Sequence, residues 1–72
     1  MKTDINIAFG RHVAALRKSA GYSQEQFAFK CDMDRTYIGT IERGEKSPTL
    51  NTIYKIACAL CVSICELFDF EI

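Results

Sequence analysis

The middle of the chain carries a polar cluster whose side chains are suited to contact a nucleic acid. Arg35, Thr36 and Thr40 share one face if the residues around them form a helix. The arginine fork matches the O6 and N7 atoms of guanine, and a threonine offers a methyl group to thymine and a hydroxyl to a base edge. We therefore expect these three residues to contact bases rather than to be solvated surface residues. Tyr37 is assigned to the same set, with phosphate contact or packing as its open alternatives.

A second set of polar residues flanks this cluster and is suited to hold the phosphate backbone of DNA. Ser23 and Gln24 stand at the expected start of a helix, where backbone amides point outward and attract anions. Arg43, Lys46 and Ser47 follow the cluster, at the end of its helix and in a loop. We expect phosphate contacts from all five, with free solvation as the alternative for a loop lysine such as Lys46.

The four cysteines, Cys31, Cys58, Cys61 and Cys65, do not follow the spacing of known zinc fingers. The last three would share one face of an uninterrupted helix, and Cys31 or His12 could in principle complete a set of four ligands. Because a second Cys-x-x-Cys pair is missing, we interpret them as small apolar residues and expect no metal or other cofactor. His12 has no nucleophile at a readable spacing, so it is expected at the surface and not as a catalytic base.

Length and composition place these residues on one small domain, residues 1–72. The chain is 49% apolar and 25% charged, an ordinary globular balance, and its nine basic and nine acidic side chains cancel. The neutral total neither supports nor excludes DNA as a partner, so local placement has to decide. We expect no enzyme, because the chain has no glycine-rich phosphate loop, no HExxH motif and no paired catalytic carboxylates.

The amino-terminal sequence does not have the pattern of a signal peptide, because Asp4, Asn6, Arg11 and His12 interrupt any apolar stretch. No apolar run approaches the ~20 residues of a membrane span. We therefore expect a soluble cytoplasmic protein with no membrane partner.

Helix start and stop signals are dense along the chain, and strand patterns are missing. Five short helices are predicted, capped by Asp4, Ser23, Asp34, Thr49 and Ser63, with Gly21 and Gly44 ending the first and third. The expected apolar positions are Ile5, Phe9, Val13 and Leu16, then Phe27, Ala28 and Cys31, then Ile38 and Ile41, then Leu50, Ile53, Ile56, Ala57 and Leu60, and finally Ile64, Leu67 and Phe68. Phe29 is also assigned to the core, because it lacks the interleaved cations of a base-stacking platform.

Residues 23–44 have the pattern of a helix-turn-helix, in which two short capped helices are joined by a turn at residues 31–34. In such a unit the second helix lies in the DNA major groove with its first residues at base edges. Gly39 leaves the backbone of that helix open to close approach.

The same segment, SQEQFAFKCDMDRTYIGTIERG, resembles the helix-turn-helix of phage-repressor and Cro-type (XRE-type) regulators. The similarity covers roughly residues 5–68, with LRKSAGYSQ before the segment and SPTLNTIYKIACALCVSICELF after it. Within that family, DRTYIGTIERG most resembles the recognition helix of the small controller proteins of restriction–modification systems. The resemblance implies an all-α, five-helix, lambda-repressor-like domain with a central helix-turn-helix, and a dimeric regulator of transcription.

The family pattern also implies an ion pair between Arg17 and Glu42, which joins the first helix to the end of the third. Cys58 and Cys65 stand where the pattern usually has polar residues, and two usual glycine positions are also occupied by other residues. Asp32 stands where the turn usually has glycine, and aspartate tolerates a left-handed backbone better than most residues. Cys61 stands before Val62 in another usual glycine position, so either its backbone is strained or the fourth helix ends differently.

Residues 53–70 offer more apolar side chains than two short helices can bury in one small core. We expect them to form the interface of a homodimer through Tyr54, Cys58, Cys61, Val62, Ile64, Cys65, Phe68 and Phe70. The alternatives are that this face is an aggregation-prone surface, or that it packs against residues 1–9 of the same chain. Two-fold pairing would place two recognition helices about 34 Å apart, one turn of DNA.

The sequence thus predicts a sequence-specific regulator that binds palindromic operator DNA as a homodimer, with no small-molecule effector evident. A restriction–modification controller that regulates its own gene is the expected subtype. The alternative is a protein-interaction module, such as an antitoxin-like partner with weak or no DNA binding. The neutral charge and the apolar carboxyl-terminal face favour that alternative, and the polar cluster at residues 35–40 argues against it.

Overall fold

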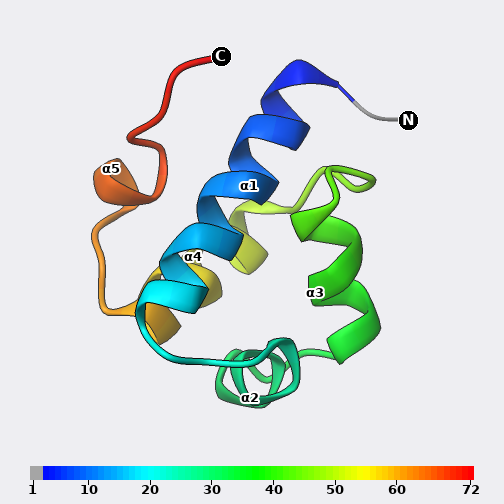
Figure 1. Ribbon diagram of the computed structural model, residues 1–72, viewed down its shortest axis with the longest axis vertical. Coiled ribbons are helices and arrows are strands. Elements are labelled where there is room, and N and C mark those ends of the chain that lie inside the picture. Colours follow the sequence, from blue (N-terminus) through cyan, green and yellow to red (C-terminus); the bar gives the residue numbers. More distant parts are fainter. Residues whose placement is uncertain (1–2) are drawn as a thin grey trace.

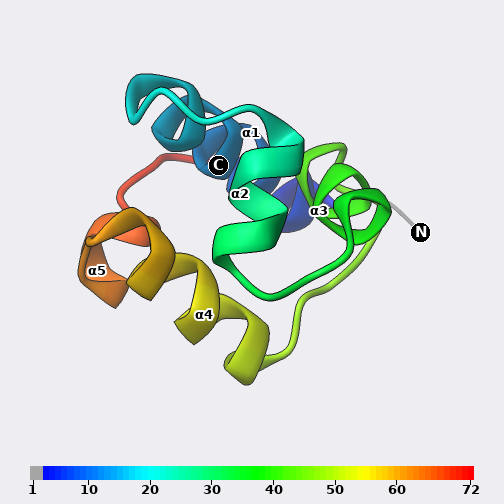
Figure 2. The ribbon, with the colours of Figure 1, turned by 90° about the horizontal axis from the view of Figure 1, so that it is seen from below.

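The computed structural model describes residues 3–72 and contains helices but no strands in that range. The helices are α1 (Asp4–Ser19), α2 (Gln24–Lys30), α3 (Arg35–Glu42), α4 (Leu50–Leu60) and α5 (Ile64–Leu67). In Figure 1, α1 crosses the centre of the molecule, with α3 on one side and α5 on the other. Figure 2 shows α2 and α3 as neighbours, joined by a short turn, with α4 and α5 grouped apart from them. The prediction of an all-α domain with five short helices is confirmed.

Capping side chains define where the helices begin. Ser23, Asp34, Thr49 and Ser63 each accept a hydrogen bond from a backbone amide of the following turn, as predicted. The prediction for the first helix is wrong by one residue, because Thr3 is the cap and accepts from the Asn6 amide. Asp4 is instead the first helical residue, where its carboxylate faces the positive end of the helix dipole.

Within residues 3–72, two residues other than glycine adopt a left-handed backbone, and both stand at the glycine positions noted in the sequence. Asp32 has φ 57° in the turn between α2 and α3, and Cys61 has φ 57° just after α4. Of the two possibilities for Cys61, the strained left-handed stop is therefore the one observed. Because α4 ends there, Cys58, Cys61 and Cys65 do not lie on one continuous helix.

The core gathers buried apolar side chains from all five helices: Phe9, Val13, Phe27, Ala28, Cys31, Ile38, Ile41, Ile56, Ala57, Ala59 and Leu67. Leu16, Ile53 and Leu60 pack against this cluster while partly exposed. Burial raises the pKa of the Cys31 thiol to about 11, so this cysteine is a neutral core residue.

Five of the predicted apolar positions lie at the surface, and two of them, Ile64 and Phe68, belong to the face that is also assigned to a dimer interface. Phe29 is 88% exposed, because it lies two residues after the buried Phe27 and so faces the other side of α2. Leu50 is 84% exposed in the first turn of α4, before that helix reaches the core. Ile5 is 44% exposed near the start of α1. None of the helices in the described range has the length and apolar character needed to cross a membrane.

Candidate nucleic-acid interface

The turn between α2 and α3 is held by backbone hydrogen bonds and by small buried side chains. The Met33 amide donates to the Ala28 carbonyl at 2.8 Å, and the Asp32 amide donates to the Phe29 carbonyl at 3.1 Å. Ala28 on α2 and Ile38 on α3 are both buried, and the two helices contact each other. This close crossing fixes the direction of α3 relative to α2, as a helix-turn-helix requires.

The start of α3 presents polar side chains to solvent. Arg35 and Thr36 are exposed, and the Asp34 carboxylate caps the helix by accepting from the Thr36 amide at 3.1 Å. A shallow hollow of about 200 Å³ lies between the starts of α2 and α3 and is lined by Gln24, Arg35, Thr36, Gly39 and Arg43. Side chains assigned to base contact and to phosphate contact thus lie around one concave surface.

Two other residues of the polar cluster are less available than Arg35 and Thr36. Thr40 is partly buried, and its hydroxyl donates to the Tyr37 carbonyl at 2.6 Å. Tyr37 is also partly buried and packs against the core, which matches the packing alternative left open for it. Thr40 therefore retains only its methyl group and an accepting oxygen for a base edge.

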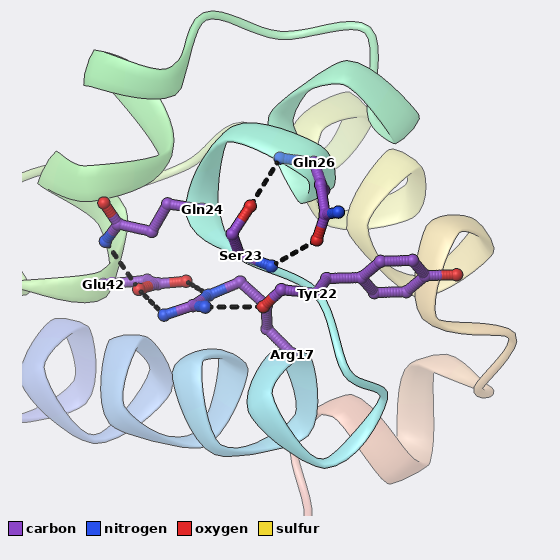
Figure 3. A network of polar contacts seen from close by, with 6 residues as sticks. All are labelled: Arg17, Tyr22, Ser23, Gln24, Gln26 and Glu42. Carbon is purple, nitrogen blue, oxygen red and sulfur yellow. Dashed lines mark hydrogen bonds and ion pairs between the residues drawn. The ribbon is translucent and has the colours of Figure 1, made fainter.

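The buried centre of the motif is an ion pair between α1 and the end of α3, shown in Figure 3. Arg17 Nε donates to Glu42 Oε2 at 2.7 Å, and Arg17 Nη2 donates to Glu42 Oε1 at 3.1 Å. The two side chains are 8% and 6% exposed. Arg17 Nη1 also donates to the Tyr22 carbonyl at 2.8 Å, so the loop before α2 joins the network. The ion pair implied by the family pattern is confirmed.

Gln24 connects the start of α2 to the same network. Its Nε2 donates to Glu42 Oε1 at 2.9 Å, so its side chain is engaged within the protein rather than free. Ser23 and Gln26 form the predicted capping box beside it, in which the Ser23 hydroxyl and the Gln26 carboxamide each accept a backbone hydrogen bond (Figure 3). In this arrangement α1, α2 and α3 share one set of directional bonds.

The loop after α3 holds the remaining residues assigned to phosphate contact. Arg43 pairs with Glu45 at 3.0 Å, and this hydrogen-bonded partner raises the pKa of Arg43 above its usual value. The guanidinium of Arg43 also lies close to Gly39. Gly39 is therefore buried, whereas the sequence predicted that its backbone would be open to close approach. Lys46 and Ser47 are exposed.

Sequence reasoning missed two residues of α1 that support this loop and the end of α3. A Cβ on Gly10 would lie 2.7 Å from the Glu42 carbonyl oxygen and nearer still to that of Ile41, so only glycine allows α1 and α3 to approach this closely. Asn6 is buried and donates from Nδ2 to Ser47 Oγ at 2.8 Å. In the sequence, the glycine at position 10 inside a predicted helix was a sign of close packing. Nothing in the sequence marked Asn6 as a buried contact.

The carboxyl-terminal residues assigned to a dimer interface divide into two groups. Tyr54, Cys58, Cys61, Ile64, Cys65 and Phe68 are exposed, whereas Val62 and Phe70 are partly buried and pack against the core. The ring of Phe68 also stacks on Phe9 at 5.0 Å, so part of this face covers the start of the same chain. Tyr54 shares a hydrogen bond with the Cys58 side chain, which raises the pKa of the tyrosine.

His12 is partly buried and not simply a surface residue. Its Nε2 donates to the Glu66 carbonyl at 2.9 Å, and its ring lies 5.5 Å from that of Phe70. The ring thus attaches the carboxyl-terminal segment to α1. Among the residues that the structure describes, no three His, Cys, Asp or Glu side chains are grouped as a metal site would need.

The fold and the exposed start of α3 define a helix-turn-helix protein, and comparison with known proteins gives the family. A family model described as helix-turn-helix (HTH_3) matches residues 13–67. The chain therefore belongs to this helix-turn-helix family.

Similar proteins include two control proteins of comparable length. Control protein C.BamHI of Bacillus amyloliquefaciens is 45% identical over 71 residues, which cover 97% of this chain and 88% of that protein. Control protein C.MunI of a Mycoplasma species is 42% identical over 67 residues, which cover 92% and 90%.

Solved structures agree with the sequence comparison. The restriction-modification controller protein C.AhdI from Aeromonas hydrophila superposes with a TM-score of 0.84 at 42% identity, over 86% of this chain and 94% of that one. The biofilm master regulator SinR, solved in complex with DNA, superposes with a TM-score of 0.80 at 31% identity, over 85% and 98%.

Proposed function

We propose that this protein is a transcriptional regulator that binds a palindromic operator as a homodimer, and that it controls a restriction–modification system. The observation that carries the proposal is the exposure of Arg35 and Thr36 at the start of α3. A buried ion pair at the other end of that helix supports it. The relatives named as control proteins support the subtype. The expected role is binding rather than catalysis, and we expect it in the cytoplasm, where operator DNA is found.

The start of α3 would enter the major groove and read base edges. Arg35 has the reach and the fork to bind guanine bidentately, and Thr36 lies one residue further along the exposed side. Thr40 and Tyr37 would contribute at the edge of this contact, because the Thr40 hydroxyl is engaged within the helix and Tyr37 is partly buried against the core.

Phosphate contacts would flank the base contacts on both sides. Ser23 and Gln24 would present the amino-terminal end of α2, where backbone amides favour an anion. Arg43, Lys46 and Ser47 would contact the backbone beyond the other end of α3. Since lysine and arginine displace counterions from DNA, affinity would fall as salt rises.

Dimerisation would double the site that one short helix can read. The exposed apolar side chains of α4, α5 and the segment between them supply a surface for a second copy. An isologous pair would set the two recognition helices about 34 Å apart and require operator half-sites related by a palindrome.

A gel-shift titration on the DNA upstream of the protein's own gene tests the proposal. The expected result is a shift at lower protein concentration for this DNA than for a scrambled duplex of the same composition. The Arg35→Ala variant serves as the matched control, because its affinities for the two duplexes should differ less than those of the unmodified protein. No shift on either duplex would overturn the proposal and favour the protein-interaction module.

A further inference from the structure

Asn6 is a buried polar side chain on α1 that contacts the loop after the recognition helix. It is 8% exposed, and its Nδ2 donates to Ser47 Oγ at 2.8 Å. Its backbone amide donates to the Thr3 hydroxyl at 3.3 Å, as part of the cap of α1. The capped start of α1 therefore holds the Ser47 hydroxyl in the loop after α3.

The backbone around Ser47 has little freedom to move away from this contact. Gly44 has φ 76°, and a Cβ at that position would lie 2.8 Å from the Ile7 Cα, so the loop lies directly on α1. Pro48 follows Ser47 and restricts the serine backbone to extended conformations. The Ser47 side chain remains exposed while its oxygen is held from beneath.

We propose that Asn6 is a positioning residue that orients the Ser47 hydroxyl toward a DNA phosphate. Because the Asn6 amide donates to the serine oxygen, the hydroxyl hydrogen is directed away from α1 and is free to donate. A phosphate oxygen is the acceptor that DNA would offer to an exposed loop beside the recognition helix. This inference rests on the proposed function, since it assigns a role in the same DNA contact.

A double-mutant cycle on DNA affinity tests the coupling. The variants are Asn6→Leu, which removes the donor at similar size, Ser47→Ala, and the combination, each titrated with a random-sequence duplex by fluorescence anisotropy. Each single change should weaken binding about tenfold, as for a lost hydrogen bond to a charged group. The double variant should bind no more weakly than either single one, since one contact is lost in all three. Losses that multiply to about a hundredfold, or unchanged affinity in Ser47→Ala, would overturn the proposal.

Asn6→Asp gives an independent readout that a purely structural role would not produce. A carboxylate at this place in the first turn is stabilised by the helix dipole and by the Ser47 hydroxyl, which offset part of the cost of its burial, and the melting temperature shows that the variant is folded. The same carboxylate can only accept a hydrogen bond, so it would turn the Ser47 hydrogen inward and weaken DNA binding. Asn51→Asp, at an exposed position on α4, is the matched control for the added negative charge.

The salt dependence separates hydroxyl orientation from charge repulsion. Between about 50 and 200 mM salt, simple repulsion should be screened, whereas a misdirected hydroxyl should still weaken binding relative to Asn51→Asp. An equal effect of Asn6→Asp with and without Ser47→Ala would mean that repulsion alone acts, and would overturn the inference. If the unmodified protein binds no duplex, the proposed function falls as well. If it binds and the variants match it, only the inference falls.

Discussion

The Glu42 side chain is 6% exposed and accepts hydrogen bonds from α1 and α2, whereas Tyr54 on α4 is 64% exposed. Around Glu42, directional bonds join the first three helices and fix the angle of α3. Around Tyr54, apolar side chains of α4 and α5 are exposed to solvent. In the function we propose, DNA reading would therefore depend on geometry within one chain, and pairing of copies would depend on apolar area.

The largest expected effect comes from breaking the buried ion pair. Arg17→Met should lower the free energy of unfolding by about 3–5 kcal/mol, because Glu42 would remain buried with its charge uncompensated. Glu42→Gln should lower the melting temperature and weaken DNA binding indirectly, by loosening α3. Urea unfolding of both single variants and the double variant measures the coupling. Additive losses of stability would mean that the two side chains do not act as a pair.

The next effect concerns the open apolar face of residues 53–70. Ile64→Arg should weaken dimerisation by about 2 kcal/mol or more, since it places a charge in the apolar interface we propose. Sedimentation at micromolar concentration should show a shift toward the 8.1 kDa monomer. Leu50→Arg is the matched control, because Leu50 is exposed on α4 but outside the proposed interface. A protein that is monomeric without any change, and stays so on DNA, would contradict the dimer.

The sequence predicted local structure well, because caps and turns depend on near neighbours. The Ser23 and Ser63 capping boxes, the Asp34 cap and the helix-turn-helix were readable from residue type and spacing. Side-chain burial was less predictable, because the exposure of Phe29 and Leu50 depends on where neighbouring helices lie. These errors come from tertiary packing, which a helical period cannot encode alone.

The site shows the same division. Exposure of Arg35 and Thr36 followed from their place at the start of a helix, and the Arg17–Glu42 pair followed from family resemblance. The contact of Asn6 with Ser47 joins residues 41 positions apart, and no local pattern marks it. Long-range contacts between a helix end and a loop therefore had to come from the structure.

A more moderate effect is expected at the base-reading end of α3. Arg35→Ala should weaken operator binding by about 1–3 kcal/mol and relax the preference at one base pair in each half-site. Lys46→Ala should instead weaken binding to all sequences alike and reduce the salt slope by about one. Competition titrations with operator and random duplexes distinguish the two patterns. Equal losses on both duplexes for Arg35→Ala would assign this residue to phosphate.

A smaller effect is expected from the buried thiol of Cys31 at alkaline pH. Its pKa rises from 9.0 to about 11 because burial disfavours the thiolate. The unfolded chain therefore loses this proton at lower pH than the folded one, so stability falls as pH rises from 9 toward 11. The loss at pH 10 should be about 1 kcal/mol. The free energy of unfolding of Cys31→Ala should not show this loss over the same pH range. If the free energies of the two proteins fall in parallel as pH rises, the prediction is contradicted.

The smallest effect on stability is expected from Phe29→Ala. This variant tests whether only one face of α2 is buried. Phe29→Ala should change the free energy of unfolding by less than about 0.5 kcal/mol, because an 88% exposed ring loses little packing. Phe27→Ala, two residues away and fully buried, should lower it by about 3–5 kcal/mol through a cavity in the core. Thermal and urea unfolding of both variants provide the comparison. A large loss at Phe29 would mean that this ring is covered in solution, which would place a contact on the outer face of the helix-turn-helix as well as on residues 53–70.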